Sequence, residues 1–172
     1  MLIWEEARAE ARKLRERFGL RPVDIDLIEV ADKLDLVVTF KKLAGGYSGL
    51  IIKEDGREGH IFINRTDSQE RQRFTLAHEI GHYVERNLRG DDEFSFADEG
   101  RKRERDGEYD LHEFFADEFA GELLMPEAEF KNLLTEGKKP SDVAEYFGVS
   151  IPAVKKRAQR IKSAEKQVAA NK

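Results

Sequence analysis

Cysteine is missing from the 172 residues of this chain. The chain can therefore form no disulfide, and it offers neither a thiolate metal ligand nor a cysteine nucleophile. Any metal site must use histidine and carboxylate side chains instead. A chain without disulfides is typical of the cytoplasm, which is where we expect this protein.

Long apolar runs are missing as well, since no stretch approaches the ~18 apolar residues that a transmembrane helix needs. Residues 1–8 have neither the basic region nor the apolar region of a signal peptide. We therefore expect a protein that is neither exported nor inserted into a membrane.

Charged residues are abundant, at 38% of the chain, and hydrophobic residues make up 40%. This composition indicates a soluble globular protein that is long enough to bury a core. The net charge of −5 argues against nucleic-acid binding over the whole surface. From residue 137 to 172, however, nine Lys or Arg oppose three Asp or Glu, a balance of +6 that leaves −11 for residues 1–136. We expect residues 1–136 to form the main domain and residues 137–172 to form a basic helical tail packed on it.

The hydrophobic pattern predicts an α+β fold. We expect two N-terminal helices, the second capped by Asp24, then a small, mainly antiparallel three-stranded sheet. A long helix over about residues 68–88 should pack on a second helix over residues 110–125. A short helix and a helical tail should follow, with fraying beyond residue 163. The predicted strands cover residues 36–40, 49–53 and 60–64.

His78, Glu79 and His82 form a His-Glu-x-x-His motif within the predicted long helix. Because a helix turns once per ~3.6 residues, the two imidazoles lie on one face and can bind one metal ion. Glu79 lies beside them and can act as general base on water at that metal. The motif therefore predicts a zinc-dependent hydrolase.

A catalytic zinc usually takes three protein ligands, so a third must come from elsewhere in the chain. Glu113 and Asp117 lie four residues apart on one predicted helical face. Glu113 is the favoured third ligand, with His112 and Asp110 as alternatives. Asp117 can accept the second ring N–H of a ligand histidine and so orient it, or it can be an ordinary surface acid.

Three features of the surrounding chain have open interpretations. Residues 89–109 are polar and can form a solvated loop or a flap beside the site. The strand over residues 60–64 can accept an extended substrate by strand addition or form an ordinary sheet edge. Tyr83, His60 and His112 are candidates for the group that stabilises the oxyanion, or they can be structural.

Two segments carry a family resemblance, Arg71-Gln-Arg-Phe-Thr-Leu-Ala-His-Glu-Ile-Gly-His82 and Glu113-Phe-Phe-Ala-Asp-Glu-Phe-Ala-Gly-Glu-Leu-Leu-Met-Pro126. They resemble the ImmA/IrrE family of metallo-endopeptidases, which are gluzincin-type zinc peptidases with a zincin-like fold. Residues 22–25 and 61–64 also resemble the sequence that precedes the motif in this family.

The resemblance implies that His78, His82 and Glu113 are the metal ligands and that Glu79 is the general base. The family often has Asn at the position of Asp117, and either side chain can accept a hydrogen bond from an imidazole. Family members cut a partner repressor, commonly a helix-turn-helix protein, and so derepress phage-like, mobile-element or stress-response genes. Zn²⁺ is the expected ion, although Mn²⁺ and iron accept the same ligands. No small-molecule cofactor is expected.

The basic tail resembles a helix-turn-helix over residues 141–157. Its second helix would expose Lys155, Lys156, Arg157 and Arg160, as a recognition helix does. The alternative function is therefore a regulator that binds DNA through this tail or sequesters a repressor without cutting it. A single motif in an acidic protein would bind DNA weakly, so we favour a helical pair that covers the core or docks a partner.

Overall fold

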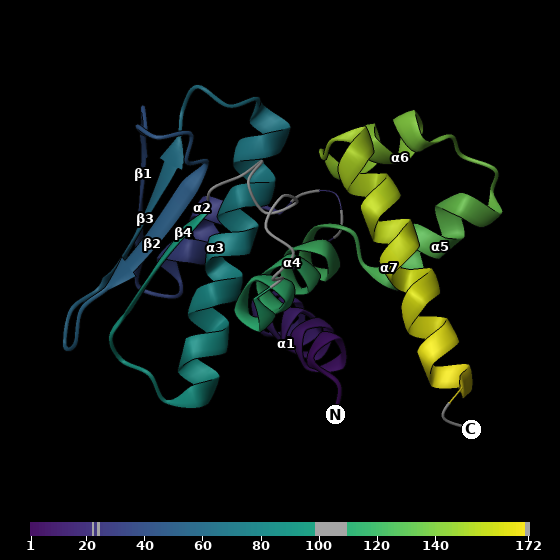
Figure 1. Cartoon of the computed structure of the whole chain (residues 1–172). Helices are drawn as coiled ribbons and strands as arrows, with labels where there is room; N and C mark the ends of the chain where they lie inside the picture. Colours follow the sequence, from purple (N-terminus) through teal and green to yellow (C-terminus); the bar gives the residue numbers. More distant parts are fainter. Residues whose placement is uncertain (22, 24, 99–109, 171–172) are drawn as a thin grey trace.

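A mixed sheet lies on one side of a long helix, α3, and a second helix, α4, lies on the other (Figure 1). This computed structural model describes residues 1–21, 23, 25–98 and 110–170. The sheet contains β1 (Leu36–Lys41), β2 (Gly49–Lys53), β3 (Gly59–Asn64) and β4 (Phe94–Asp98). The helices are α1 (Ile3–Phe18), α2 (Leu27–Asp32), α3 (Gln69–Arg89), α4 (Leu111–Leu124), α5 (Glu127–Thr135), α6 (Pro140–Phe147) and α7 (Ile151–Ala170). The α+β class predicted from the sequence is confirmed.

The sheet has four strands in the order β1-β3-β2-β4, so the prediction of three strands is wrong. The additional strand, β4, falls in the segment that was expected to be a loop. Phe94 and Phe96 alternate with Ser95 there, which is the period of a strand, but charged residues on both sides hide so short a pattern. The rest of that segment, residues 99–109, lies outside the described residues.

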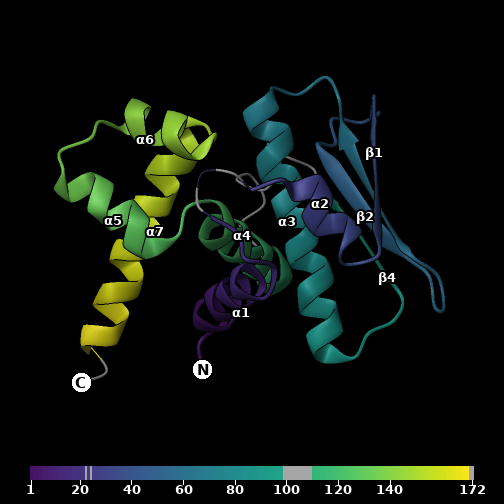
Figure 2. The same cartoon turned by 180° about the vertical axis from the view of Figure 1, so that it is seen from behind.

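Strand β3 occupies the inside of the sheet, with β1 parallel to it on one side and β2 antiparallel on the other. Both of its edges are therefore hydrogen-bonded, and the idea that residues 60–64 receive a substrate strand is wrong. Strand β4 pairs antiparallel with β2, so two of the three pairings are antiparallel, as expected. From behind, α2 lies between β1 and α3 (Figure 2).

The helix ends follow local capping chemistry. The Ser68 hydroxyl accepts a hydrogen bond from the Arg71 N–H and begins α3. Asp26 caps α2 by accepting from the N–H groups of Ile28 and Glu29, so the expected start at Asp24 is too early. Asp24 itself lies outside the described residues. The prediction of fraying beyond residue 163 is also wrong, because α7 continues to Ala170.

Helix α4 is the centre of the molecule and packs against both α1 and α3. Its apolar side chains Phe115, Ala116 and Phe119 are fully buried. Gly81 of α3 faces Ala116, and a Cβ at Gly81 would lie only 3.0 Å from the Ala116 Cα atom. The missing side chain therefore lets the two helices cross closely, although glycine costs about 1 kcal/mol relative to alanine inside a helix.

The tail residues share the core of the remaining chain. Val143, Phe147, Val154 and Ile161 of α6 and α7 are buried in the same hydrophobic cluster as the apolar residues of α4. The division into residues 1–136 and 137–172 stays a prediction. Among the described residues, no helix combines the length and the apolar character that crossing a membrane requires.

Candidate metal centre

The crossing of α3 and α4 brings three potential ligand side chains together. The His78 Nε2 atom lies 3.4 Å from one Glu113 carboxylate oxygen, and the His82 Nε2 atom lies 3.2 Å from the other. The two imidazole rings are edge to face with centroids 4.7 Å apart. Among the described residues, these three side chains form a group whose ligand atoms all lie within 4.8 Å of one another.

This donor set fits a zinc ion. The two Nε2 atoms lie 3.4 and 3.2 Å from different oxygens of the Glu113 carboxylate, so all three side chains can reach one ion. Two imidazoles and a carboxylate leave a fourth position for water or substrate, as in catalytic rather than structural zinc sites. That these three residues are ligands stays a prediction.

The Asp117 carboxylate lies against the His78 ring. Its Oδ1 atom lies 3.0 Å from the His78 Nδ1 atom, in a pair that is buried on both sides. When Nδ1–H donates to this carboxylate, the lone pair of the ring remains on Nε2, which faces Glu113. The sequence spacing predicted this contact, because four residues after Glu113 is one helical turn further along α4.

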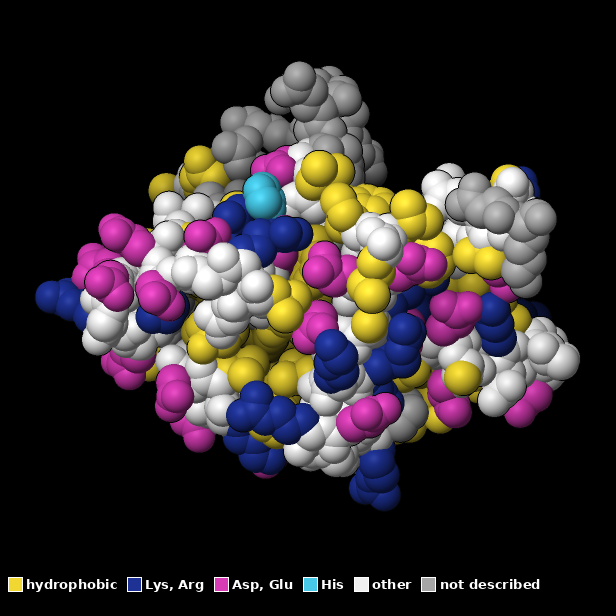
Figure 3. Space-filling view, turned by 90° about the horizontal axis from the view of Figure 1, so that it is seen from below, with side chains coloured by type: hydrophobic (Ala, Val, Ile, Leu, Met, Phe, Trp, Pro, Cys, Tyr) yellow, Lys and Arg dark blue, Asp and Glu magenta, His cyan; other side chains and the backbone are white. Residues whose placement is uncertain are grey.

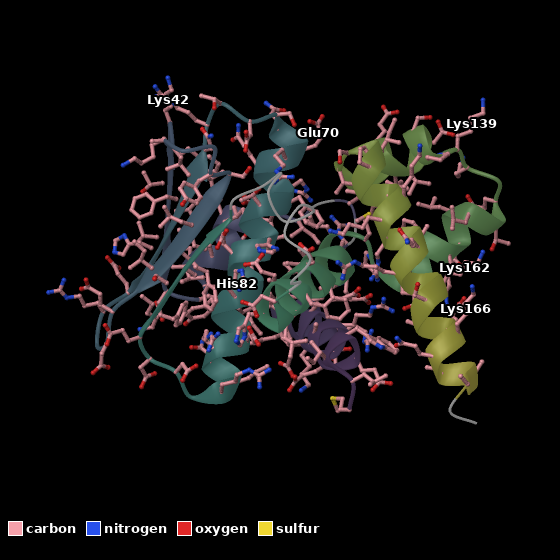
Figure 4. The ribbon with its side chains drawn as sticks, viewed as in Figure 1. Lys42, Glu70, His82, Lys139, Lys162 and Lys166 are labelled. Carbon is pink, nitrogen blue, oxygen red and sulfur yellow. The ribbon has the colours of Figure 1, made fainter. Side chains whose placement is uncertain are left out.

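Glu79 of α3 is fully buried, and its carboxylate faces the start of β2. A Cβ at Gly49 of β2 would lie 3.1 Å from the Glu79 Oε1 atom. The strand therefore approaches the carboxylate closely, and a larger residue at this position would displace it. Figure 4 shows the neighbouring ligand candidate, His82, in the middle of α3, with the sheet on one side and α4 on the other.

An aromatic side chain that the sequence reasoning did not select covers His82. The Phe96 ring of β4 lies parallel to the His82 ring, with centroids 4.3 Å apart and an interplanar angle of 1°. The Arg86 guanidinium lies 4.7 Å from the centroid of the same Phe96 ring. The Phe94-x-Phe96 alternation was the sequence signal that could have predicted β4 and, with it, an aromatic ring near the site.

The other candidate residues have different surroundings. The Asp110 carboxylate caps α4 by accepting from the His112 N–H. The His112 Nδ1 atom lies 2.8 Å from the buried carboxylate of Glu85. His60 stacks on Phe62 in the middle of the sheet, and Tyr83 packs near Phe94. His60 lies on the exposed face of the sheet, opposite the buried Ile61 and Ile63, so the expectation that it stabilises the oxyanion is wrong. Tyr83 and His112 remain candidates, and His112 adjoins Glu113 in sequence.

The fold and the site together define a class: an α+β protein in which two crossed helices present two histidines and a carboxylate to one point. The family model described as "IrrE N-terminal-like domain", a peptidase family, matches residues 31–159. The chain belongs to this family, as its two motifs indicated.

One solved structure, described as "Mycobacterium tuberculosis transcriptional regulator", has a TM-score of 0.60 and 17% sequence identity to this chain. The match covers 87% of this chain and 45% of the other, so the chain spans less than half of that protein. At this identity the likeness concerns the fold alone. The search of curated proteins gave no match.

Proposed function

We propose that this protein is a metal-dependent endopeptidase that cuts a transcriptional regulator, with His78, His82 and Glu113 holding Zn²⁺ and Glu79 acting as general base. The observation that carries the proposal is the convergence of the three ligand atoms, together with the Asp117 carboxylate on His78. Membership of a peptidase family supports hydrolysis as the chemistry. We place the protein in the cytoplasm, where such a substrate is found.

The chemistry divides between the ion and the chain. A zinc ion supplies Lewis-acid chemistry that polarises the scissile carbonyl and lowers the pKa of water toward ~7. Glu79 accepts the proton that the attacking water loses and donates it to the departing amine nitrogen. Asp117 holds the His78 ring in place, and Phe96 shields one face of His82 from solvent.

The proposed substrate is a helix-turn-helix repressor, which the resemblance to repressor-cutting family members suggests. The solved structure with the same fold is described as a transcriptional regulator, and this fits a role near gene control without defining it. Zn²⁺ is the proposed ion, and manganese and iron accept the same ligands.

The competing function, DNA binding through the tail, loses support from the α7 side chains. Lys156, Arg157 and Arg160 all form ion pairs with carboxylates of α4. On the surface seen in Figure 3, acidic and basic side chains are interspersed. Lys162 and Lys166 of α7 lie on the side away from the sheet (Figure 4). If the protein retards the migration of DNA in a low-salt gel, DNA binding through the tail is supported after all.

The test of the proposed function is Glu79→Gln, which preserves shape and removes the proton acceptor. We expect zinc binding to persist and cleavage of helix-turn-helix repressors from the same genome, tested as substrates, to fall by about 10²–10⁴-fold. Cleavage is followed by gel electrophoresis, with chelator-treated wild type as the control. Cleavage near the wild-type rate in the variant would overturn the role of Glu79, and cleavage unaffected by chelator would overturn the metal mechanism.

A further inference from the structure

The Asp117 carboxylate is shared between the candidate metal centre and the C-terminal helix. Its Oδ1 atom faces the His78 ring, while its Oδ2 atom lies 3.0 Å from the Lys156 Nζ and 3.3 Å from an Arg160 guanidinium nitrogen. Its side chain is only 3% exposed. One buried carboxylate therefore joins a candidate ligand on α3 to two cations on α7.

We propose that Lys156 and Arg160 are positioning residues of the metal centre, which hold Asp117 in the orientation that presents the His78 Nε2 atom to the metal. The inference rests on the proposed metal site. It assigns to the tail a part in metal binding, although the tail contributes no ligand of its own.

A buried carboxylate needs compensation for the solvation that it loses. His78 supplies the hydrogen bond to Oδ1, and the second oxygen, Oδ2, needs partners as well. Lys156 and Arg160 approach that second oxygen. Hydrogen bonds between ionised partners are shorter and stronger than neutral ones, so these two fix the carboxylate plane and with it the acceptor that His78 uses.

The cations also explain why a carboxylate suits this position. An asparagine amide accepting from His78 would turn its NH₂ group toward Lys156 and Arg160, and three donors would then face one another. The aspartate gives each neighbour an acceptor. The pairing of Asp117 with two cations is therefore chemically consistent in this chain.

The position of Arg160 is itself secured by a second acid. Its other guanidinium nitrogen lies 2.9 Å from Glu118, the residue after Asp117, and its guanidinium carbon lies 4.8 Å from the Phe114 ring centroid. The guanidinium thus bridges two consecutive carboxylates of α4. Lys156, by contrast, is half exposed, so its replacement leaves the core packing intact.

The test is the zinc dissociation constant of the full chain, measured by competition with a chromophoric chelator. For Lys156→Met/Arg160→Met we expect zinc affinity to fall about tenfold, at the lower end of the effect of removing a group that orients a ligand directly. As single substitutions, Lys156→Met should lower zinc affinity and Lys156→Arg should keep most of it, because arginine retains the cation. The thermal unfolding midpoint is recorded for every variant to verify folding.

Lys131→Met is the matched control. Lys131 has a similar exposure and pairs with Glu165 of α7 at 2.7 Å and with Glu127 at 2.6 Å, and neither acid belongs to the candidate centre. Its replacement removes a contact of the same helix without touching Asp117, so we expect zinc affinity within twofold of wild type.

The possible results distinguish a failure of the positioning role from a failure of the proposed metal site. Unchanged affinity in the double variant, or an equal loss in Lys131→Met, overturns the positioning role while the metal site stands. Wild-type protein that fails to bind zinc overturns both. If the double variant does not fold, Lys156→Met alone decides, because its half-exposed side chain can be removed without creating a cavity.

Discussion

Helix α4 contacts α3 and α7 through different chemistry. Toward α3 it presents small and aromatic apolar residues, and Gly81 allows the backbones to approach closely. Toward α7 it presents Asp117, Glu118 and Glu122, which receive the long cationic side chains of that helix. One helix thus combines a tightly packed apolar contact with a contact built from ion pairs.

The two contacts should contribute differently to the position of α4 and to the stability of the fold. Close packing resists displacement, so it suits the side that must hold Glu113 within a few tenths of an ångström of its place. Charge-assisted hydrogen bonds are directional, so they define how α7 lies on α4, but the desolvation of the charges offsets much of their free energy. Substitutions at each contact should therefore differ in kind as well as in size.

The largest effect is expected at the ion-paired contact, from Arg157→Met. The Arg157 side chain is buried against Glu122, and it also donates to the Met125 carbonyl oxygen at 3.2 Å. Burial lowers the pKa of its guanidinium below the ordinary value of an arginine, and the neighbouring Glu122 partly offsets this effect. Removing Arg157 takes from the buried Glu122 its closest cation and leaves Arg12 at 3.5 Å, so the free energy of unfolding should fall by about 3 kcal/mol.

Urea denaturation measures this loss, and Lys155→Met, an exposed position on the same helix, provides the control. The control should stay within about 0.5 kcal/mol of wild type. A loss below about 1 kcal/mol for Arg157→Met would mean that α7 is held mainly by its apolar residues.

An intermediate effect is expected at the apolar contact, from Gly81→Ala. The new Cβ would lie 3.0 Å from the Ala116 Cα atom and 3.2 Å from its carbonyl oxygen, so the α4 backbone must move. Overpacking costs about 1–3 kcal/mol and the better helix former returns up to about 1 kcal/mol, which leaves a net loss of about 1–2 kcal/mol. Glu113 moves with α4, so zinc affinity should fall as well. Denaturation and zinc titration check the two effects, and unchanged values in both would contradict the close crossing.

The smallest effect, of opposite sign, is expected from Gly121→Ala, where α4 faces α7. A Cβ there would meet the Arg157 side chain at 3.5 Å, which is ordinary contact. The gain in helix propensity should therefore dominate and raise the free energy of unfolding by about 0.5–1 kcal/mol. A destabilised variant in the same denaturation assay would show that the α4–α7 contact is as tightly packed as the α3–α4 contact.

The resemblance of two segments identified the family. Helical spacing identified the side chains that converge, because it places His78 and His82 on one face of α3 and Glu113 and Asp117 on one face of α4. The roles of these residues stay predictions. Strand β4 was missed because two phenylalanines are too short a pattern among charged neighbours. The place of β3 inside the sheet was missed because strand spacing does not specify which strands pair.

The favoured interpretation of the tail was a helical pair that covers the core or docks a partner, and its apolar residues do lie in the shared hydrophobic cluster. Its cations, however, were expected to be exposed, because a basic helix considered alone shows no partner. Lys156 meets Asp117 across 39 residues, and Arg8 of α1 meets Glu118 across 110. Contacts at such separations depend on the tertiary arrangement, which local patterns do not encode.

The sharing of Asp117 between His78 and α7 also has a consequence during protein synthesis. The chain leaves the ribosome from its N-terminus, so the His-Glu-x-x-His helix emerges long before Lys156 and Arg160. A nascent chain that has reached only α4 carries all three candidate ligands, yet Asp117 has still to meet its cations. Zinc affinity would then rise about tenfold once α7 has been made and its two cations reach Asp117, so the candidate centre would hold its ion most tightly after these contacts have formed.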